Sequence, residues 1–170
     1  MVRQATDERS HLAPWRRVLE ERARQAVDSL AQVPGVLGLI LCGSVGRGEA
    51  WPLSDVDVIP LYEDGWAGRA ANEVESKRLE LLDWWTDEGY CTSLDVGRLA
   101  FTRSEVAQAL ALSPREAARY LDDPRWFHSL DKAYRGGAEF DPEGLAAALA
   151  RWLTDARFMP EVVRGRREAH

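Results

Sequence analysis

Two carboxylates, Asp55 and Asp57, stand two residues apart in a segment with the composition of a buried strand. Residues i and i+2 of a strand point to the same face, so these side chains would lie about 6 to 7 Å apart. Val56 and Val58 would bury the opposite face, and carboxylates on such a core strand are costly unless a cation compensates them. Mg²⁺ is the natural cation, because it prefers oxygen ligands and commonly shares its coordination sphere with phosphates. A polar strand end that faces solvent is the alternative interpretation.

A glycine-rich turn at residues 43–49 follows a short apolar run and precedes the two aspartates. Such a turn, leading into a short helix, can bind phosphate oxygens through unpaired backbone N–H groups and the helix dipole. Ser44 adds a hydroxyl donor. A Walker loop does not fit, because Glu49 stands where that loop needs lysine. Taken alone, the segment is better explained as an ordinary turn with glycines at positive φ, and only its combination with the aspartates favours phosphate binding.

The segments around these residues must position them. Apolar residues that recur every three and four positions predict a helix over residues 14–31, beginning at Pro14. The continuously apolar run 36–41 predicts a strand covered on both faces, and residues 55–61 predict the next strand. These two strands would be joined by the glycine-rich turn.

The second half of the chain contains one more strand-like segment and is otherwise predicted to be mostly helical. A helical face ends near Gly89, and residues 90–101 return to strand-like composition with Asp95 in their middle. Capping chemistry marks the starts of three later helices, at Thr102 with Glu105, at Ser113-Pro114 with Glu116, and at Asp141-Pro142. The predicted fold class is α/β of the α+β kind, a small mixed sheet flanked by helices, with a helical C-terminal region. We expect a catalytic domain over residues 1–141, with its core at about 35–101, and a C-terminal helix with a basic tail over residues 142–170.

Length, composition and charge fit a globular cytoplasmic protein. The 170 residues are long enough to bury a core, and no run of 18 apolar residues interrupts them. The first ten residues lack the apolar stretch of a signal peptide. The net charge of −6 argues against a nucleic-acid binder held mainly by phosphate contacts. We therefore expect neither nucleic acid nor a membrane among the partners.

Together these motifs resemble the nucleotidyltransferases related to DNA polymerase β, which include aminoglycoside nucleotidyltransferases and minimal toxin or antitoxin transferases. Their pattern is Gly-Ser, a spacer, and Asp-x-Asp on the next strand. Here it stands as Gly43-Ser44, ten intervening residues and Asp55-Val56-Asp57, with Ser54 before the pair. The family carries a third carboxylate on a neighbouring strand, and Asp95 is the natural match, although a lone Asp in a strand is more often a surface residue. The resemblance spans residues 35–142 and is most specific at 43–57.

The resemblance implies transfer of a nucleoside monophosphate from an NTP, with ATP expected, to a hydroxyl of a small-molecule acceptor, antibiotic-like by analogy. Pyrophosphate would be released. Asp55 and Asp57 would bridge two Mg²⁺ or Mn²⁺ ions, of which one lowers the pKa of the acceptor hydroxyl and the other holds the triphosphate. Asp95 would complete the shell of the first ion and could accept the acceptor's proton. Gly43 and Ser44 would hold the β and γ phosphates.

Several other side chains are weaker candidates. Arg47 and Lys132 could neutralise phosphate charge, although solvated surface positions are the commoner role for such cations. His128 could act as a base in principle, but a core or interface role is more common, and Trp51 and Trp66 could stack on a nucleotide or acceptor. The nucleotide-binding residues expected are Gly43, Ser44, Arg47, Ser54 and Lys132.

Two other functions stay open. A toxin- or antitoxin-type transferase would modify protein or RNA, and a regulatory module would bind nucleotide without turnover, which the intact aspartates disfavour. Two-domain small-molecule members carry a larger helical domain after the core than this chain does. We therefore expect acceptor contacts from residues 102–135 or from a second subunit, and a homodimer unless the natural chain continues further.

Overall fold

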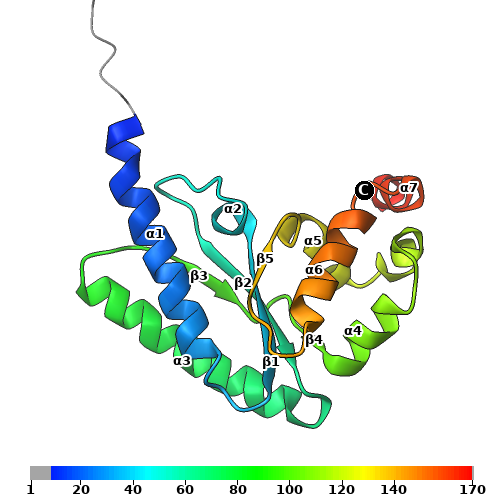
Figure 1. Ribbon diagram of the computed structural model, residues 1–170, viewed down its shortest axis with the longest axis horizontal. Helices are drawn as coiled ribbons and strands as arrows, with labels where there is room; N and C mark the ends of the chain where they lie inside the picture. The colour runs from blue at the N-terminus through cyan, green and yellow to red at the C-terminus, as the bar shows by residue number, and fades with distance from the viewer. Residues whose placement is uncertain (1–8, 170) are drawn as a thin grey trace, which may run out of the picture.

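A five-stranded mixed sheet forms the centre of the computed structural model, which describes residues 9–169 (Figure 1). Its strands are β1 (Val36–Cys42), β2 (Val56–Tyr62), β3 (Leu94–Val96), β4 (Phe101–Thr102) and β5 (Gly137–Phe140). Strand β1 pairs antiparallel with β2 on one side and with β5 on the other. Strands β3 and β4 both run parallel to β2, and they pair with different parts of it. The predicted small mixed sheet is confirmed.

Helices cover both faces of this sheet. They are α1 (Arg9–Leu30), α2 (Gly43–Gly46), α3 (Ala67–Asp87), α4 (Arg103–Leu110), α5 (Pro124–Lys132), α6 (Leu145–Ala156) and α7 (Pro160–Glu168), with short 3-10 helices η1 (Asp64–Trp66) and η2 (Pro114–Tyr120). Figure 1 shows α1 and α3 on one side of the sheet and α4 to α7 on the other. Within the described residues, no helix combines the length and the apolar character needed to cross a membrane.

Each face of the sheet has its own hydrophobic core, because successive side chains of a strand point in opposite directions. On β1, Leu39 packs in the core under α1 and α3, whereas its neighbour Ile40 packs in the core under α4 to α7. On β2, Val56 and Val58 belong to the first core. Asp57, which alternates with them, therefore faces the side of the sheet that α5 covers.

The C-terminal helix α6 completes the second core. Its residues Ala146, Leu149 and Leu153 are fully buried together with residues of β1 and β2. An apolar stripe of this kind stabilises the helix by packing rather than by propensity alone. The predicted domain boundary between residues 141 and 142 stays a prediction.

Three predicted boundaries were wrong. Helix α1 does not begin at Pro14 but at Arg9, so that Pro14 lies inside the helix. Pro14 is the sixth residue of this helix, beyond the first four N–H groups that have no intrahelical partner, so its missing N–H removes one backbone hydrogen bond. Strand β2 begins at Val56, and Asp55 therefore lies just before the strand. The strand-like segment 90–101 forms strands only at β3 and at the first residue of β4.

The capping motifs mark the predicted helix starts with different accuracy. Thr102 and Glu105 form a reciprocal capping box at the start of α4. The box that begins at Ser113 opens a 3-10 helix rather than an α-helix. Asp141 lies four residues before α6, but its carboxylate still accepts the N–H groups of Ala146 and Ala147, both at 2.9 Å. The residue types were therefore informative even where the boundary moved.

Candidate active site

A cavity of about 810 Å³ opens where α2, the loop before β2, β3 and α5 meet. All of the residues predicted for catalysis, metal binding or nucleotide binding line this one cavity. They are Gly43, Ser44, Arg47, Ser54, Asp55, Asp57, Asp95 and Lys132. Residues that are up to 89 positions apart in the sequence are thus brought to one place by the pairing of β1, β2 and β3 and by the packing of α5.

Gly43 allows the turn after β1 to approach the Asp57 carboxylate. It has a φ of +62°, a conformation that L side chains rarely adopt. A β-carbon at this position would also lie 2.0 Å from Asp57 Oδ2, which is closer than any non-bonded contact permits. Glycine is therefore required at this position for two reasons: the backbone has a positive φ, and the Asp57 carboxylate leaves no room for a β-carbon.

A pair of serines fixes the loop between α2 and β2. Ser44 Oγ donates a hydrogen bond to Ser54 Oγ at 2.8 Å, and the backbone N–H of Trp51 donates to the same oxygen at 3.0 Å. Ser54 is buried. In this arrangement the Ser54 hydroxyl closes the loop, and the loop holds the exposed Trp51 at the cavity.

Asp57 and Asp95 stand side by side at the floor of the cavity. They are register partners on the parallel strands β2 and β3, so their side chains project from the same face. The Asp57 side chain is only 10% exposed. Burial raises the pKa of Asp57, and the neighbouring charges of Asp95 and Asp55 raise it further, whereas a hydrogen bond from Lys132 opposes the increase. The predicted neighbouring-strand position of Asp95 is confirmed, and its catalytic role stays a prediction.

Asp55 lies at the exposed end of this carboxylate group. It immediately precedes β2 and is open to solvent, in contrast to the buried Asp57. It also lines the cavity, and its negative charge contributes to the raised pKa of Asp57. The two carboxylates of the Asp-x-Asp motif therefore differ strongly in environment, although they act on the same space.

Lys132, the last residue of α5, binds the buried carboxylate. Its Nζ lies 2.5 Å from Asp57 Oδ1 and 4.0 Å from Asp95 Oδ2. The lysine side chain extends from the cavity wall to Asp57 on the floor, and 39% of it is exposed. Lys132 is thus not a solvated surface cation in this structure. Arg47 is half-buried and pairs with Glu49 at 3.0 Å.

The cavity floor offers oxygen donors that suit a divalent metal ion. Within residues 9–169, no group of three or more His, Cys, Asp or Glu side chains is arranged to hold a metal ion. The donor chemistry nevertheless fits Mg²⁺ or Mn²⁺, because Asp55, Asp57 and Asp95 all line this cavity and all offer carboxylate oxygens. The ammonium of Lys132 shows that a positive charge is accommodated between two of them.

Helix α5 forms a cavity wall that the sequence analysis did not predict as an element. It begins after Asp123, which caps it by accepting the N–H of Arg125, and has Pro124 at its first position. This is the same Asp-Pro signature that was recognised at residues 141–142, so the signal was present in the sequence. The exposed His128 also lies on this wall, together with Arg125 and Asp131.

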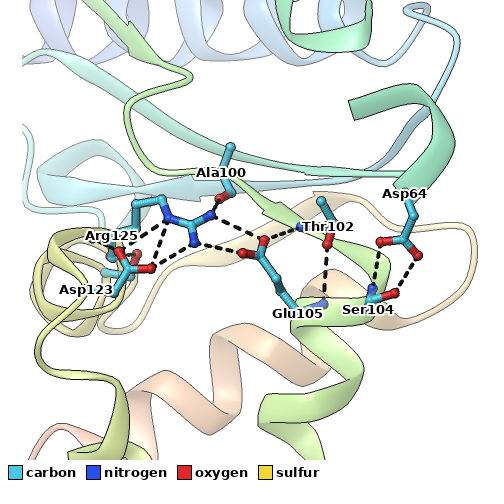
Figure 2. Close-up of polar contacts among 8 residues, drawn as sticks. Asp64, Ala100, Thr102, Ser104, Glu105, Asp123 and Arg125 are labelled. Carbon is cyan, nitrogen blue, oxygen red and sulfur yellow. Dashed lines mark hydrogen bonds and ion pairs between the residues drawn. The ribbon is translucent and has the colours of Figure 1, made fainter. Parts of the chain in front are cut away.

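An ion-pair network anchors the N-terminal end of α5 (Figure 2). Arg125 lies between Asp123 and Glu105, with guanidinium-carboxylate distances of 2.8 and 2.7 Å, and it also donates to the backbone oxygen of Ala100 at 3.2 Å. Glu105 belongs to α4, so the network ties α5 to α4 and to the segment before β4. Planar guanidinium groups suit this multiple recognition of carboxylates. The wall that carries Lys132 is therefore held in place at its far end.

Trp66 does not belong to the cavity. It lies after the opposite end of β2 and packs on Gly35, where a β-carbon would lie 2.6 Å from the tryptophan's own β-carbon. The hypothesis that Trp66 stacks on a nucleotide was therefore wrong for this site. Of the two tryptophans considered, Trp51 alone lines the cavity.

A comparison with protein families agrees with this geometry. The model of the nucleotidyltransferase domain family matches residues 20–108, which is more than half of the 170 residues. The chain belongs to this nucleotidyltransferase family. The matched range contains the glycine-serine turn, all three aspartates of the cavity floor and the capping box of α4. Neither the comparison with curated proteins nor that with solved structures found a match.

Nucleotidyltransferases move a nucleoside monophosphate, and the match supports that general activity for this chain. The matched range ends at residue 108, so α5 to α7 lie beyond it. Lys132 and the rest of the α5 wall are therefore features of this nucleotidyltransferase that the family match does not describe.

Proposed function

We propose that this nucleotidyltransferase transfers the nucleoside monophosphate of an NTP to a hydroxyl of a small-molecule acceptor, with a divalent metal ion as cofactor. The observation that carries the proposal is the buried Asp57 beside Asp95 and Asp55, directly beneath the turn at Gly43, in a cavity of about 810 Å³. That volume lies within the range of about 300 to 1,000 Å³ common for small-molecule sites.

The carboxylates would hold the metal ions. Asp57 and Asp95 lie next to each other on adjacent strands, and Asp55 adds a third carboxylate from the solvent side. When bound, Mg²⁺ would neutralise the charge of the triphosphate and lower the pKa of the acceptor hydroxyl. The buried position of Asp57 suits this role. Burial disfavours its ionised form and so raises its pKa, and a nearby cation stabilises that ionised form.

The other residues of the cavity would position the two substrates. Gly43 and Ser44 line the cavity, and their backbone N–H groups could hold phosphate oxygens, with Arg47 beside them. The Ser44 hydroxyl could do so after giving up its hydrogen bond to Ser54. The exposed ring of Trp51 offers a surface for a base or an acceptor ring.

In the reaction, the acceptor hydroxyl oxygen would form a bond to the α-phosphorus of the NTP while the bond from that phosphorus to the bridging oxygen breaks. Pyrophosphate leaves with the bonding electrons, and the hydroxyl proton passes to a base. Asp95 is well placed as that base, because it is less buried than Asp57 and lies at the same floor. Orientation of the two substrates would supply much of the rate enhancement.

Calorimetric titration with each of the four NTPs, with and without Mg²⁺, tests the proposal on the wild type and on Asp57→Asn. We expect Mg²⁺-dependent binding that the substitution weakens at least tenfold. Asp83→Asn is the matched control, because Asp83 is an exposed carboxylate on α3 outside the cavity. Binding that ignores both Mg²⁺ and Asp57→Asn would sink the proposal. Acceptors are then found by screening hydroxyl-bearing compounds for pyrophosphate release.

A further inference from the structure

Lys132 occupies the place between two carboxylates where a metal ion would be expected to bind. Its ammonium contacts Asp57 Oδ1 at 2.5 Å and lies 4.0 Å from Asp95 Oδ2. The other oxygen of Asp57 faces Gly43, whose hypothetical β-carbon would stand 2.0 Å away. A metal ion that approaches Asp57 from the cavity must therefore compete with the ammonium for Oδ1.

The buried carboxylate needs a positive partner whether or not a metal ion is bound. Asp57 is only 10% exposed and has Asp55 and Asp95 as like-charged neighbours. A buried charge without a counter-charge is strongly destabilising. Within the described residues, Lys132 is the one cation that lies within ion-pair distance of Asp57. The lysine therefore stabilises the ligand-free site.

The helix that carries Lys132 is held, but the lysine side chain is free to move. The Arg125 network fixes the start of α5, and Asp131, next to Lys132, pairs with Arg157 at 3.1 Å and with Arg166 of α7. In contrast, the ammonium sits on a flexible four-carbon stem and is 39% exposed to the cavity. It can leave Asp57 without a movement of the helix, provided that another anion receives it.

We propose that Lys132 is a tethered counter-ion that a divalent metal ion displaces from Asp57, and that the nucleotide's phosphates then accept its ammonium. This inference rests on the proposed function. Its consequence is coupling: metal alone binds weakly, because it must displace the lysine without a new partner for it. Metal and nucleotide together bind well, because the polyphosphate supplies that partner. By reciprocity, each ligand increases the affinity for the other by the same factor, and typical couplings are about 5- to 150-fold.

Titration with Mn²⁺, alone and with a non-hydrolysable ATP analogue, tests this coupling by electron paramagnetic resonance and calorimetry. In the wild type we expect the analogue to strengthen Mn²⁺ binding at least fivefold. In Lys132→Met, Mn²⁺ alone should bind about tenfold more tightly than to the wild type, and the strengthening by the analogue should shrink. Lys132→Arg keeps a cation and should retain weak binding of Mn²⁺ alone. Lys77→Met is the control, since Lys77 pairs with Glu80 on α3, outside the cavity.

Thermal melting separates a folding defect from a binding effect. Lys132→Met leaves Asp57 without its partner, so it should melt below the wild type in EDTA and gain more from Mn²⁺ than the wild type gains. The double variant Asp57→Asn/Lys132→Met removes both charges and should recover stability in EDTA without binding Mn²⁺. These melting shifts do not depend on catalysis.

Equal affinity of wild type and Lys132→Met for Mn²⁺ alone would overturn the counter-ion role, and so would weaker binding by the variant. In either case, nucleotide binding that still needs the metal ion would leave the proposed function standing. If the wild type shows no metal-dependent nucleotide binding at all, the proposed function fails, and the counter-ion role fails with it.

Discussion

The backbone of Gly43 passes so close to Asp57 that a β-carbon on the glycine would stand 2.0 Å from the carboxylate oxygen Oδ2. The contact joins the first motif of the family to the second, since Gly43 follows β1 and Asp57 lies on β2. Antiparallel pairing places Cys42 opposite Asp57, which sets the turn directly beside the carboxylate. Between the two motifs the chain leaves β1 through α2 and returns through a loop to pair beside it as β2.

Gly43→Ala should therefore be far more damaging than an ordinary glycine substitution. A left-handed backbone costs an alanine about 1 to 2 kcal/mol, and the clash with Asp57 should add about 1 to 3 kcal/mol, as overpacking does elsewhere. Gly48→Ala is the matched control, because Gly48 also has a positive φ of +72° but no atom within 4 Å of its hypothetical β-carbon. Urea unfolding measures both losses. Equal losses would show that Asp57 moves aside without cost.

The environment of Asp57 should appear in the pH dependence of stability. Its pKa in the folded protein is raised above the ordinary 3.8, mainly by burial, so the folded state holds this proton more tightly than the unfolded state. Stability from this group is then lost as pH rises from about 3.8 through the raised pKa. Asp57→Asn cannot ionise and should escape that loss.

The measurement is urea unfolding in EDTA between pH 3.5 and 7.5. The stability of wild type relative to Asp57→Asn should fall as pH rises and then level off. Taking this difference removes the opposite contribution of carboxylates whose pKa is lowered, such as Glu63 and Glu143 beside Arg103. A difference that rises with pH would mean that the ion pair with Lys132 outweighs burial.

The sequence predicted the cavity floor better than the cavity wall, for a physical reason. The floor depends on local patterns: two aspartates in alternation with buried valines, and a glycine-serine turn between strands. The start of helix α5 is marked locally by Asp123-Pro124, but its position as the cavity wall depends on tertiary contacts, such as the Arg125 network with α4, which leave little trace in a window of nearby residues. The same holds for β5, a four-residue strand with no buried residue, whose place is decided by pairing with β1.

Contacts between individual side chains also could not be predicted from the sequence. Lys132 was a candidate for phosphate binding, but its ion pair with Asp57 links residues 75 positions apart and depends on how α5 packs. The homodimer and the acceptor stay predictions, and sedimentation would test the first directly.

The two cysteines should react very differently with alkylating reagents. Cys91 is exposed, whereas Cys42 is buried beside Asp57 in the register of β1 and β2. Burial, followed by the charge of Asp57, raises the pKa of Cys42 to about 12, so its reactive thiolate is scarce at neutral pH. At pH 8, iodoacetamide should modify one cysteine per folded chain quickly, and mass spectrometry of peptides should locate it at Cys91. Rapid modification of both would contradict the buried position of Cys42.

Arg98 should contribute to binding without contributing to stability. It is exposed at the cavity, and within the described part of the chain it makes no hydrogen bond or ion pair. Substitutions at such positions usually change stability by less than about 0.5 kcal/mol. Its positive charge nevertheless faces the space proposed for polyanionic nucleotide, where an unpaired guanidinium attracts phosphate.

Arg98→Glu should therefore leave the unfolding midpoint almost unchanged and weaken metal-nucleotide binding several-fold. Because the effect is electrostatic and partly exposed to solvent, it should be larger at 20 mM than at 500 mM salt. Arg24→Glu makes the same charge change on the exposed side of α1, outside the cavity, and controls for the altered net charge. Equal weakening by both variants would assign the effect to net charge, whereas weakening by Arg98→Glu alone would place the nucleotide or its acceptor beside β3.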